Sequence, residues 1–235
     1  MKKLFLLMMM LGVSAGILNA QKADKKADKV IDQYLKAVGG KKLDKVDEVL
    51  QKMTFKANGQ EMQTEILTSK KGRGYMKMNM GGMEFVIYAY KGDKGFMMNQ
   101  QMGYDEIPEE QLKELKEQKQ SYLHGLDNYQ AFDRKYLGTK TVDGKEYEVV
   151  ELSKDGQTSL MYFNPKNHLL EIIITKNPET GMETATYLLD YKDFDGVKFP
   201  TKMQIRQGDM VQQEITVDEV KLNPQVDESV FEMPE

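Results

Sequence analysis

The chain has 235 residues, a formal net charge of -4, and neither cysteine nor tryptophan. Without cysteine there are no disulfides, no thiol catalysis, no zinc–thiolate site and no lipid anchor on an N-terminal cysteine. A mildly acidic chain lacks the clustered positive charge that nucleic acids and anionic membrane surfaces attract, so we expect no nucleic-acid partner.

The first 20 residues follow the plan of a secretory signal peptide. Two lysines precede an apolar run from Leu4 to Leu18, and Ala20 supplies a small residue at the cleavage site. The run is shorter than the roughly 20 apolar residues that a membrane span needs. Cleavage after Ala20 would remove two positive charges and leave residues 21–235, enough for one domain with a sizeable core. We therefore expect a single periplasmic domain.

A helix is predicted at the start of this domain, over residues 22–38. Its apolar side chains recur at spacings of three and four, and Gly39 and Gly40 provide the stop. The apolar positions are Ala27, Val30, Ile31, Tyr34, Leu35 and Val38. The helix should be amphipathic and pack through one face.

From Leu43 onward the hydrophobic period changes to two, which is typical of strands. The predicted strands cover residues 45–57, 60–69, 73–80, 83–91 and 94–99. The short turns between them are rich in glycine, asparagine and aspartate, so successive strands should pair as an antiparallel meander.

The third and fourth of these strands form the most informative hairpin, because Gly81 and Gly82 can close a tight two-residue turn. The turn places Met80 opposite Met83, Met78 opposite Phe85, and Met76 opposite Ile87. One face of the hairpin is thus soft and apolar, since thioether chains fit many shapes. It is either an ordinary core face or the lining of a cavity for a flexible apolar ligand.

A charged helical segment interrupts the meander at residues 108–124. Pro108 begins it, acidic residues occupy the first turn and lysines come later, which is the order that a helix dipole favours. Its apolar edge is narrow and includes Leu112 and Leu115. The segment is either a lid across a curved sheet or a surface crossover.

The strands then resume in a second meander. They are predicted over residues 135–142, 145–153, 157–163, 169–176, 182–193, 197–207 and 210–222. Eleven or twelve antiparallel strands are too many for a flat sheet. We therefore predict a mainly β protein with helices, in which a strongly curved half-barrel of about 11 strands carries an N-terminal helix and a helical lid. Inward-facing candidates in this half include Met161, Phe163, Ile172 and Ile174.

Several motifs resemble one known protein family. They are Lys91–Phe96, Thr141–Tyr147, Met161–Pro165, Asp190–Pro200 and Val226–Pro234. Together with the order of helix, meander, lid and return meander, they are similar to the LolA-like and LolB-like periplasmic proteins that sort outer-membrane lipoproteins. Phe96 stands where that family usually has a tryptophan.

The resemblance implies a monomeric, non-enzymatic carrier or chaperone without a cofactor or metal. Its concave apolar face would shelter the acyl chains of a lipid or lipoprotein, received from and delivered to partners at the inner and outer membranes. The candidate lipid-binding residues are Met76, Met78, Met80, Met83, Phe85, Ile87, Phe96, Met98, Leu112, Leu115, Met161, Phe163, Ile172 and Ile174. Arg73 lies near the position of the family's cavity arginine, although a surface arginine is the simpler interpretation.

Two alternatives remain at this point. The first is a structural or envelope module whose interior is filled. The second is a copper binder, because Met76, Met78 and Met80 place three thioethers on one strand face and soft sulfur suits Cu(I). Neither His124 nor His168 is near them in sequence. The sequence contains none of the common hydrolase, metalloprotease or dinucleotide-binding motifs.

Overall fold

A computed structural model describes residues 24–57, 59–119, 122–154, 156–176 and 180–234. The predicted signal peptide lies outside the described residues. The fold is mainly β, with one antiparallel sheet of 13 strands and a few helices. Among the helices that the structure describes, none has the length and apolar character needed to cross a membrane.

The first half of the chain contains two helices and six strands. These are α1 (Lys25–Val38), the 3-10 helix η1 (Gly40–Lys45), β1 (Glu48–Ala57), β2 (Gln60–Ser69), β3 (Arg73–Met80), β4 (Met83–Lys91), β5 (Lys94–Met98) and β6 (Tyr104–Glu106). A connection comes next, made of α2 (Glu109–Lys119) and the 3-10 helix η2 (Leu126–Ala131). The second half consists of β7 (Asp133–Val142), β8 (Lys145–Lys154), β9 (Gln157–Phe163), β10 (Leu170–Lys176), β11 (Glu183–Phe194), β12 (Val197–Gln207), β13 (Met210–Leu222) and the 3-10 helix η3 (Glu228–Phe231).

The sheet has 13 strands, whereas the sequence predicted a total of about 11 and offered twelve strand ranges. The strand outside those twelve ranges is β6, whose three residues Tyr104–Glu106 pair with β5. The sequence did not predict β6, because a three-residue strand that contains two adjacent carboxylates shows neither alternation of apolar and polar residues nor a run of β-branched residues.

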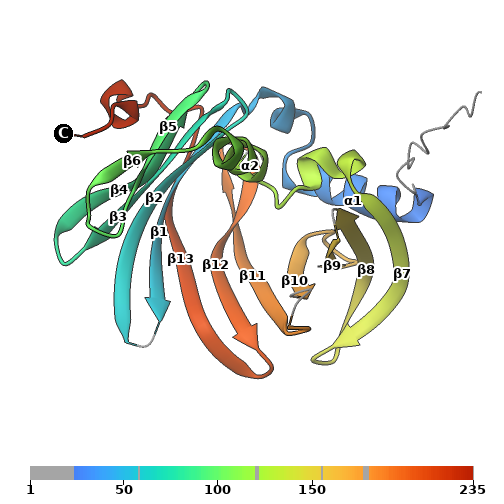
Figure 1. Ribbon diagram of the computed structural model, residues 1–235. Coiled ribbons are helices and arrows are strands. Elements are labelled where there is room, and N and C mark those ends of the chain that lie inside the picture. Colours follow the sequence, from blue (N-terminus) through green and yellow to red (C-terminus); the bar gives the residue numbers. More distant parts are fainter. Residues whose placement is uncertain (1–23, 58, 120–121, 155, 177–179, 235) are drawn as a thin grey trace, which may run out of the picture.

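The two meanders join in the middle of the sheet. The strand order is β6-β5-β4-β3-β2-β1-β13-β12-β11-β10-β9-β8-β7, so the first strand pairs with the last, and β6 and β7 remain as unjoined edges. Figure 1 shows the sheet arching from one edge to the other without closing. The predicted curved antiparallel sheet is confirmed as an open one.

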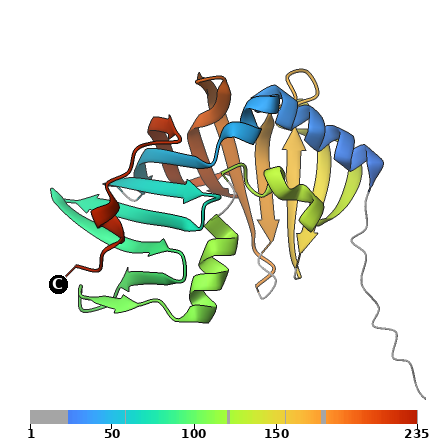
Figure 2. The same ribbon diagram turned by 90° about the horizontal axis from the view of Figure 1, so that it is seen from above.

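The position of the lid segment is a result of this strand order. Because β6 and β7 lie at opposite edges, the chain between them must cross from one arm of the arch to the other. In Figures 1 and 2 this connection, with α2 and η2, runs over the concave side of the sheet, next to α1.

Helix α1 forms as predicted and covers the concave face of the second half. The Asp24 carboxylate caps its first turn by accepting from the Lys26 backbone N–H at 2.8 Å, and Gly39 ends it. Its buried side chains join strands β8 to β13 in the largest core cluster. Within that cluster the rings of Tyr34 and Phe163 meet edge to face at 5.7 Å.

Candidate functional site

The β3–β4 hairpin keeps most of its predicted register. Met80 pairs with Met83 and Met78 with Phe85, which confirms the position of the glycine turn. The third predicted pair, Met76 with Ile87, is wrong, because the register shifts between Met76 and Lys77 and Met76 pairs with Tyr88. A β-bulge of this kind moves the later residues of one strand to the other face. Tyr88 therefore faces the concave side.

Cross-strand rows define the concave face of the first half. One row runs from Met53 on β1 through Thr64 and Met78 to Phe85 on β4. Met53 packs in the core beneath α1, which fixes this side of the sheet as the concave one. Met78 and Phe85 are only half-buried.

These half-buried residues form what we call the open apolar face. It is defined by Phe55, Met62, Met78 and Phe85, which alternate with polar side chains on four adjacent strands. Met83 continues this face at the hairpin tip, where its side chain is 64% exposed. The side chain of Met80 is not among those described. Half-exposed apolar side chains on the concave face of a sheet are a typical ligand-binding feature.

Helix α2 covers the neighbouring part of the same face. Leu112 is buried and Leu115 half-buried against Tyr88 and Tyr90, in a cluster that also takes in Met76, Ile87 and Met97. The described polar contact between α2 and the sheet side is an ion pair from Lys116 to Asp93 at 2.9 Å, and Asp93 is fully exposed. Such a surface pair contributes little to stability.

The predicted lid segment is divided between two environments. Its first part is α2, but Tyr122 and Leu123 are 9% and 2% exposed and belong to the main core under α1. The Tyr122 hydroxyl donates to the Leu43 carbonyl oxygen at 3.3 Å. Tyr122 and Leu123 are thus part of the core rather than of a cover.

Two of the candidates from the second half lie in that core. Met161 and Phe163 face the concave side, as predicted, but they are 4% and 1% exposed beneath α1. The structure does not bring them together with Met78 and Phe85 on the open apolar face.

Ile172 and Ile174 were predicted to face inward, and the structure places them on the convex face. Both pack with Tyr147 and Tyr162 there. The reason is a register shift between Leu170 and Ile172, which turns the rest of β10 over.

Phe96 lies on the convex face as well, although it was predicted to line the cavity. It packs with Tyr75 beneath the C-terminal segment and meets the Tyr104 ring at 5.4 Å. Met98 pairs with Tyr104 and shares the side of Phe96, while Met97 is the β5 methionine that joins the concave cluster.

Arg73 fastens the C-terminal segment to the convex face. Its guanidinium group donates to Glu48 at 2.6 and 2.7 Å and to Glu228 of η3 at 2.7 Å, and it lies over the Phe231 ring. The guanidinium group holds the pKa of the buried Glu48 carboxyl below its usual value. This arginine is neither free nor on the concave face.

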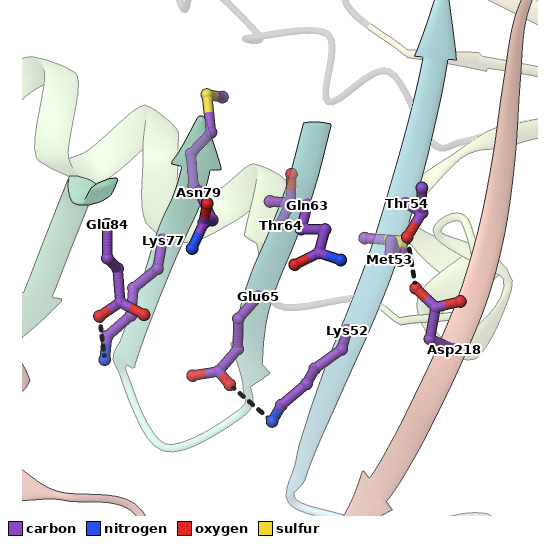
Figure 3. Close-up of a pocket in the computed structure, with 11 residues that line it drawn as sticks. Lys52, Met53, Thr54, Gln63, Thr64, Glu65, Lys77, Asn79, Glu84 and Asp218 are labelled. Carbon is purple, nitrogen blue, oxygen red and sulfur yellow. Dashed lines mark hydrogen bonds and ion pairs between the residues drawn. The ribbon is translucent and has the colours of Figure 1, made fainter. Parts of the chain in front are cut away.

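The convex face also carries a pocket of about 350 Å³. Figure 3 shows paired charges along its lining strands, with Lys52 close to Glu65 and Lys77 close to Glu84. Each of these charges has a partner of opposite sign on the neighbouring strand, and such cross-strand pairs stabilise a sheet. A pocket lined by paired charges is unsuited to an acyl chain. The described residues contain no group of three or more histidine, aspartate or glutamate side chains that could hold a metal ion.

Three buried hydroxyl groups on the concave face have no hydrogen-bond partner among the described residues. They belong to Thr64, Tyr88 and Tyr90. Burial raises the pKa of Tyr90 to about 12, and burial with the neighbouring Tyr90 raises the pKa of Tyr88 further. An unpartnered buried hydroxyl costs roughly 1–3 kcal/mol. Sequence patterns alone could not find these groups, because the bulge decides which way Tyr88 faces.

The fold of this chain is similar to that of several solved structures. No family model matches the chain, and no curated protein matches it. Among solved structures, a LolA superfamily protein from Nitrosomonas europaea aligns with a TM-score of 0.57 at 11% identity, over 87% of this chain and 96% of that one. A DUF1329 family protein from Desulfovibrio piger aligns with a TM-score of 0.55 at 11% identity, over 88% and 97%.

A third solved structure is a putative outer membrane lipoprotein-sorting protein domain from Vibrio parahaemolyticus. It aligns with a TM-score of 0.53 at 10% identity, over 88% of this chain and 97% of that one. All three alignments span nearly the whole of both chains, so they compare complete folds. With its open, curved antiparallel sheet and with helices α1 and α2 on the concave side, the protein has a LolA-like fold.

Proposed function

We propose that this protein is a periplasmic, non-catalytic binder or carrier of acyl chains, acting in the sorting of outer-membrane lipoproteins. The observation that carries the proposal is the open apolar face, whose residues are half-buried although they lie inside the curve of the sheet. Two solved structures with a similar fold are named as a LolA superfamily protein and a putative lipoprotein-sorting domain, and these names support the same proposal.

The energetics of acyl-chain burial suit such a surface. Each methylene moved out of water contributes about 0.8 kcal/mol, so ten sheltered methylenes give about 8 kcal/mol, which corresponds to micromolar affinity before ordering costs. Methionine side chains can repack around chains of different length. A carrier that must release its cargo benefits from such loose complementarity.

The bound chain would lie against the first half of the sheet. Beneath α1 the concave face is filled by side chains such as Ile31, Tyr34 and Phe163, each at most 1% exposed. Outside this core, the side chains of Met78 and Phe85 on β3 and β4 remain half-buried and offer apolar surface that an acyl chain would remove from water.

A non-catalytic module with a filled interior is the second candidate. The observation that favours it is the cluster under α2, where Leu112 already covers Tyr88 and Tyr90. The two functions differ in one measurable respect, since only the carrier should be purified from cells with a stoichiometric ligand bound.

The first test is native mass spectrometry of residues 21–235 exported to a bacterial periplasm, compared with a solvent-extracted sample. A stoichiometric phospholipid, fatty acid or acylated protein would support the carrier. Clean protein, when delipidation during purification is excluded, would favour the filled module.

Two neighbouring substitutions then test the face itself. Met78→Asp places a charge on the open apolar face, and we expect it to abolish uptake of a fluorescent acyl probe. Asn79→Asp adds the same charge on the convex side of the same strand and keeps the oxygen that accepts from the Gly82 N–H at 3.1 Å. It should bind the probe like the parent. Full uptake by a folded Met78→Asp protein would contradict the proposed face.

A further inference from the structure

Tyr88 and Tyr90, which carry two of the unpartnered hydroxyls, pack in one cluster with Leu112 of α2. Both side chains are on β4, at 7% and 1% exposure, and their rings stack with centroids 6.4 Å apart. A phenylalanine at either position would fill the same space without leaving a hydroxyl unsatisfied. The tyrosine hydroxyls therefore call for an explanation other than packing.

The surroundings of Tyr90 are built to accommodate its full length. It pairs with Gly74 on one neighbouring strand and Gly95 on the other. A Cβ atom at Gly74 would lie 2.8 Å from the Tyr90 hydroxyl oxygen, and one at Gly95 would lie 2.8 Å from the Tyr90 Cβ. Glycine inside a strand weakens it and often marks a close approach by another group. Here the two glycines leave the room that the tyrosine occupies.

The two hydroxyls are neutral hydrogen-bond donors. Burial alone raises the pKa of Tyr90 to about 12, and no charged side chain contributes to the raised pKa of either tyrosine. A carboxylate placed here would be buried without a cation beside it, which is strongly unfavourable. A neutral carbonyl oxygen would instead satisfy the donors at little cost.

From this geometry we infer that Tyr88 and Tyr90 form a polar anchor that donates hydrogen bonds to the ester or amide carbonyl of a bound acyl chain. The inference rests on the proposed acyl-chain function and specifies its ligand class. The chain lies along Met76 and the open apolar face, and its carbonyl takes the place over the tyrosines when Leu112 moves aside. Acyl esters and amides are preferred over hydrocarbons and over ionised fatty acids.

The test uses three probes with matched chain length: methyl palmitate, heptadecane and palmitate. Each is presented from cyclodextrin to residues 21–235 and competed against a fluorescent acyl probe. The variants are Tyr88→Phe, Tyr90→Phe and the double substitution. The matched control is Tyr75→Phe, because the Tyr75 hydroxyl is also on a buried ring of the same hairpin but faces the convex side and donates to Glu65 at 2.7 Å.

We expect the parent to bind methyl palmitate more tightly than heptadecane or palmitate. Each tyrosine substitution should weaken methyl palmitate about fivefold, the equivalent of one hydrogen bond, and leave heptadecane unchanged. The thermal midpoint of Tyr88→Phe and Tyr90→Phe should stay level or rise, since an unpartnered hydroxyl is removed. Tyr75→Phe should lower the midpoint and leave all three affinities unchanged.

Three results would overturn the anchor. If the parent binds hydrocarbon and ester equally and the tyrosine variants do the same, the anchor is wrong although the acyl-chain function stands. If the variants lose heptadecane and methyl palmitate together, the tyrosines act through packing alone. A parent that takes up none of the probes contradicts both the anchor and the proposed function.

Discussion

Helices α1 and α2 both cover the concave side of the sheet, but they are attached in very different ways. Helix α1 buries five side chains in the main core, among them Ile31 and Tyr34. Helix α2 buries Leu112 fully and Leu115 in part, and it meets the sheet side through an ion pair with an exposed aspartate.

The polar contacts of α1 are also more numerous than those beneath α2 among the described residues. Arg134 of β7 donates to Asp28 of α1 at 2.6 Å and to the Phe132 carbonyl oxygen at 2.9 Å, so it holds α1 and η2 to the second half. Beneath α2, by contrast, Tyr88 and Tyr90 leave two hydroxyls without a partner in the described chain. Helix α1 is thus part of the main core, whereas α2 is held to the sheet by fewer buried contacts.

The largest effect is expected from removing the contact that fixes α1. Arg134→Ala should reduce the free energy of unfolding by about 3–5 kcal/mol, because Asp28 loses its partner and several carbonyl groups lose a donor. Chemical denaturation measures the change. Lys116→Ala on α2 is the matched control and should leave the unfolding transition where it is. Equal effects of the two substitutions would show that both helices are integral to the core.

A smaller effect is expected from trimming one apolar side chain on each helix. Ile31→Ala should cost about 3 kcal/mol of unfolding free energy, and Leu112→Ala about 2 kcal/mol, since the site under α2 can relax more easily. Only Leu112→Ala should speed dissociation of a bound acyl probe in stopped-flow measurements. Faster release from Ile31→Ala at unchanged release from Leu112→Ala would reverse the assignment of core and cover.

The smallest effect concerns pH and the convex side of the first half. Because Arg73 lowers the pKa of Glu48 in the folded state, this ion pair stabilises the fold above the unfolded value of about 4.5 and the stabilisation fades as the pH falls through the folded pKa. In Glu48→Gln, urea midpoints should therefore fall less steeply than in the parent below that pH. Parallel curves would mean that the pair contributes no acid sensitivity.

Much of the fold could be predicted from alternation and turn chemistry. The N-terminal helix and twelve of the strands lie close to the expected ranges, because each strand is bounded by glycine, asparagine or aspartate turns. What the pattern could not reveal was the pairing of β1 with β13, since strands far apart in sequence leave no local signal.

The candidate site was harder to predict, and the reason is the β-bulge. A bulge inserts one residue and reverses the inward and outward sides of the strand beyond it, with no distinctive residue type to mark it. The shift after Leu170 turned Ile172 and Ile174 outward, and the shift at Met76 brought Tyr88 inward. Strictly local features, such as the pairing of Met78 with Phe85 beside the glycine turn, were predicted correctly.

The seam between β1 and β13 has a consequence for how the chain folds. Every other pair of strands in the sheet joins neighbours in sequence, so its hydrogen bonds can form outward from the connecting segment. The seam instead pairs Val49 with Leu222 and therefore closes the longest loop between paired strands. We expect the two meanders to form first and the seam to form last. A nascent chain without β13 would expose β1 and β12 as unprotected edges, which are templates for aggregation, so complete synthesis is a condition for a soluble product.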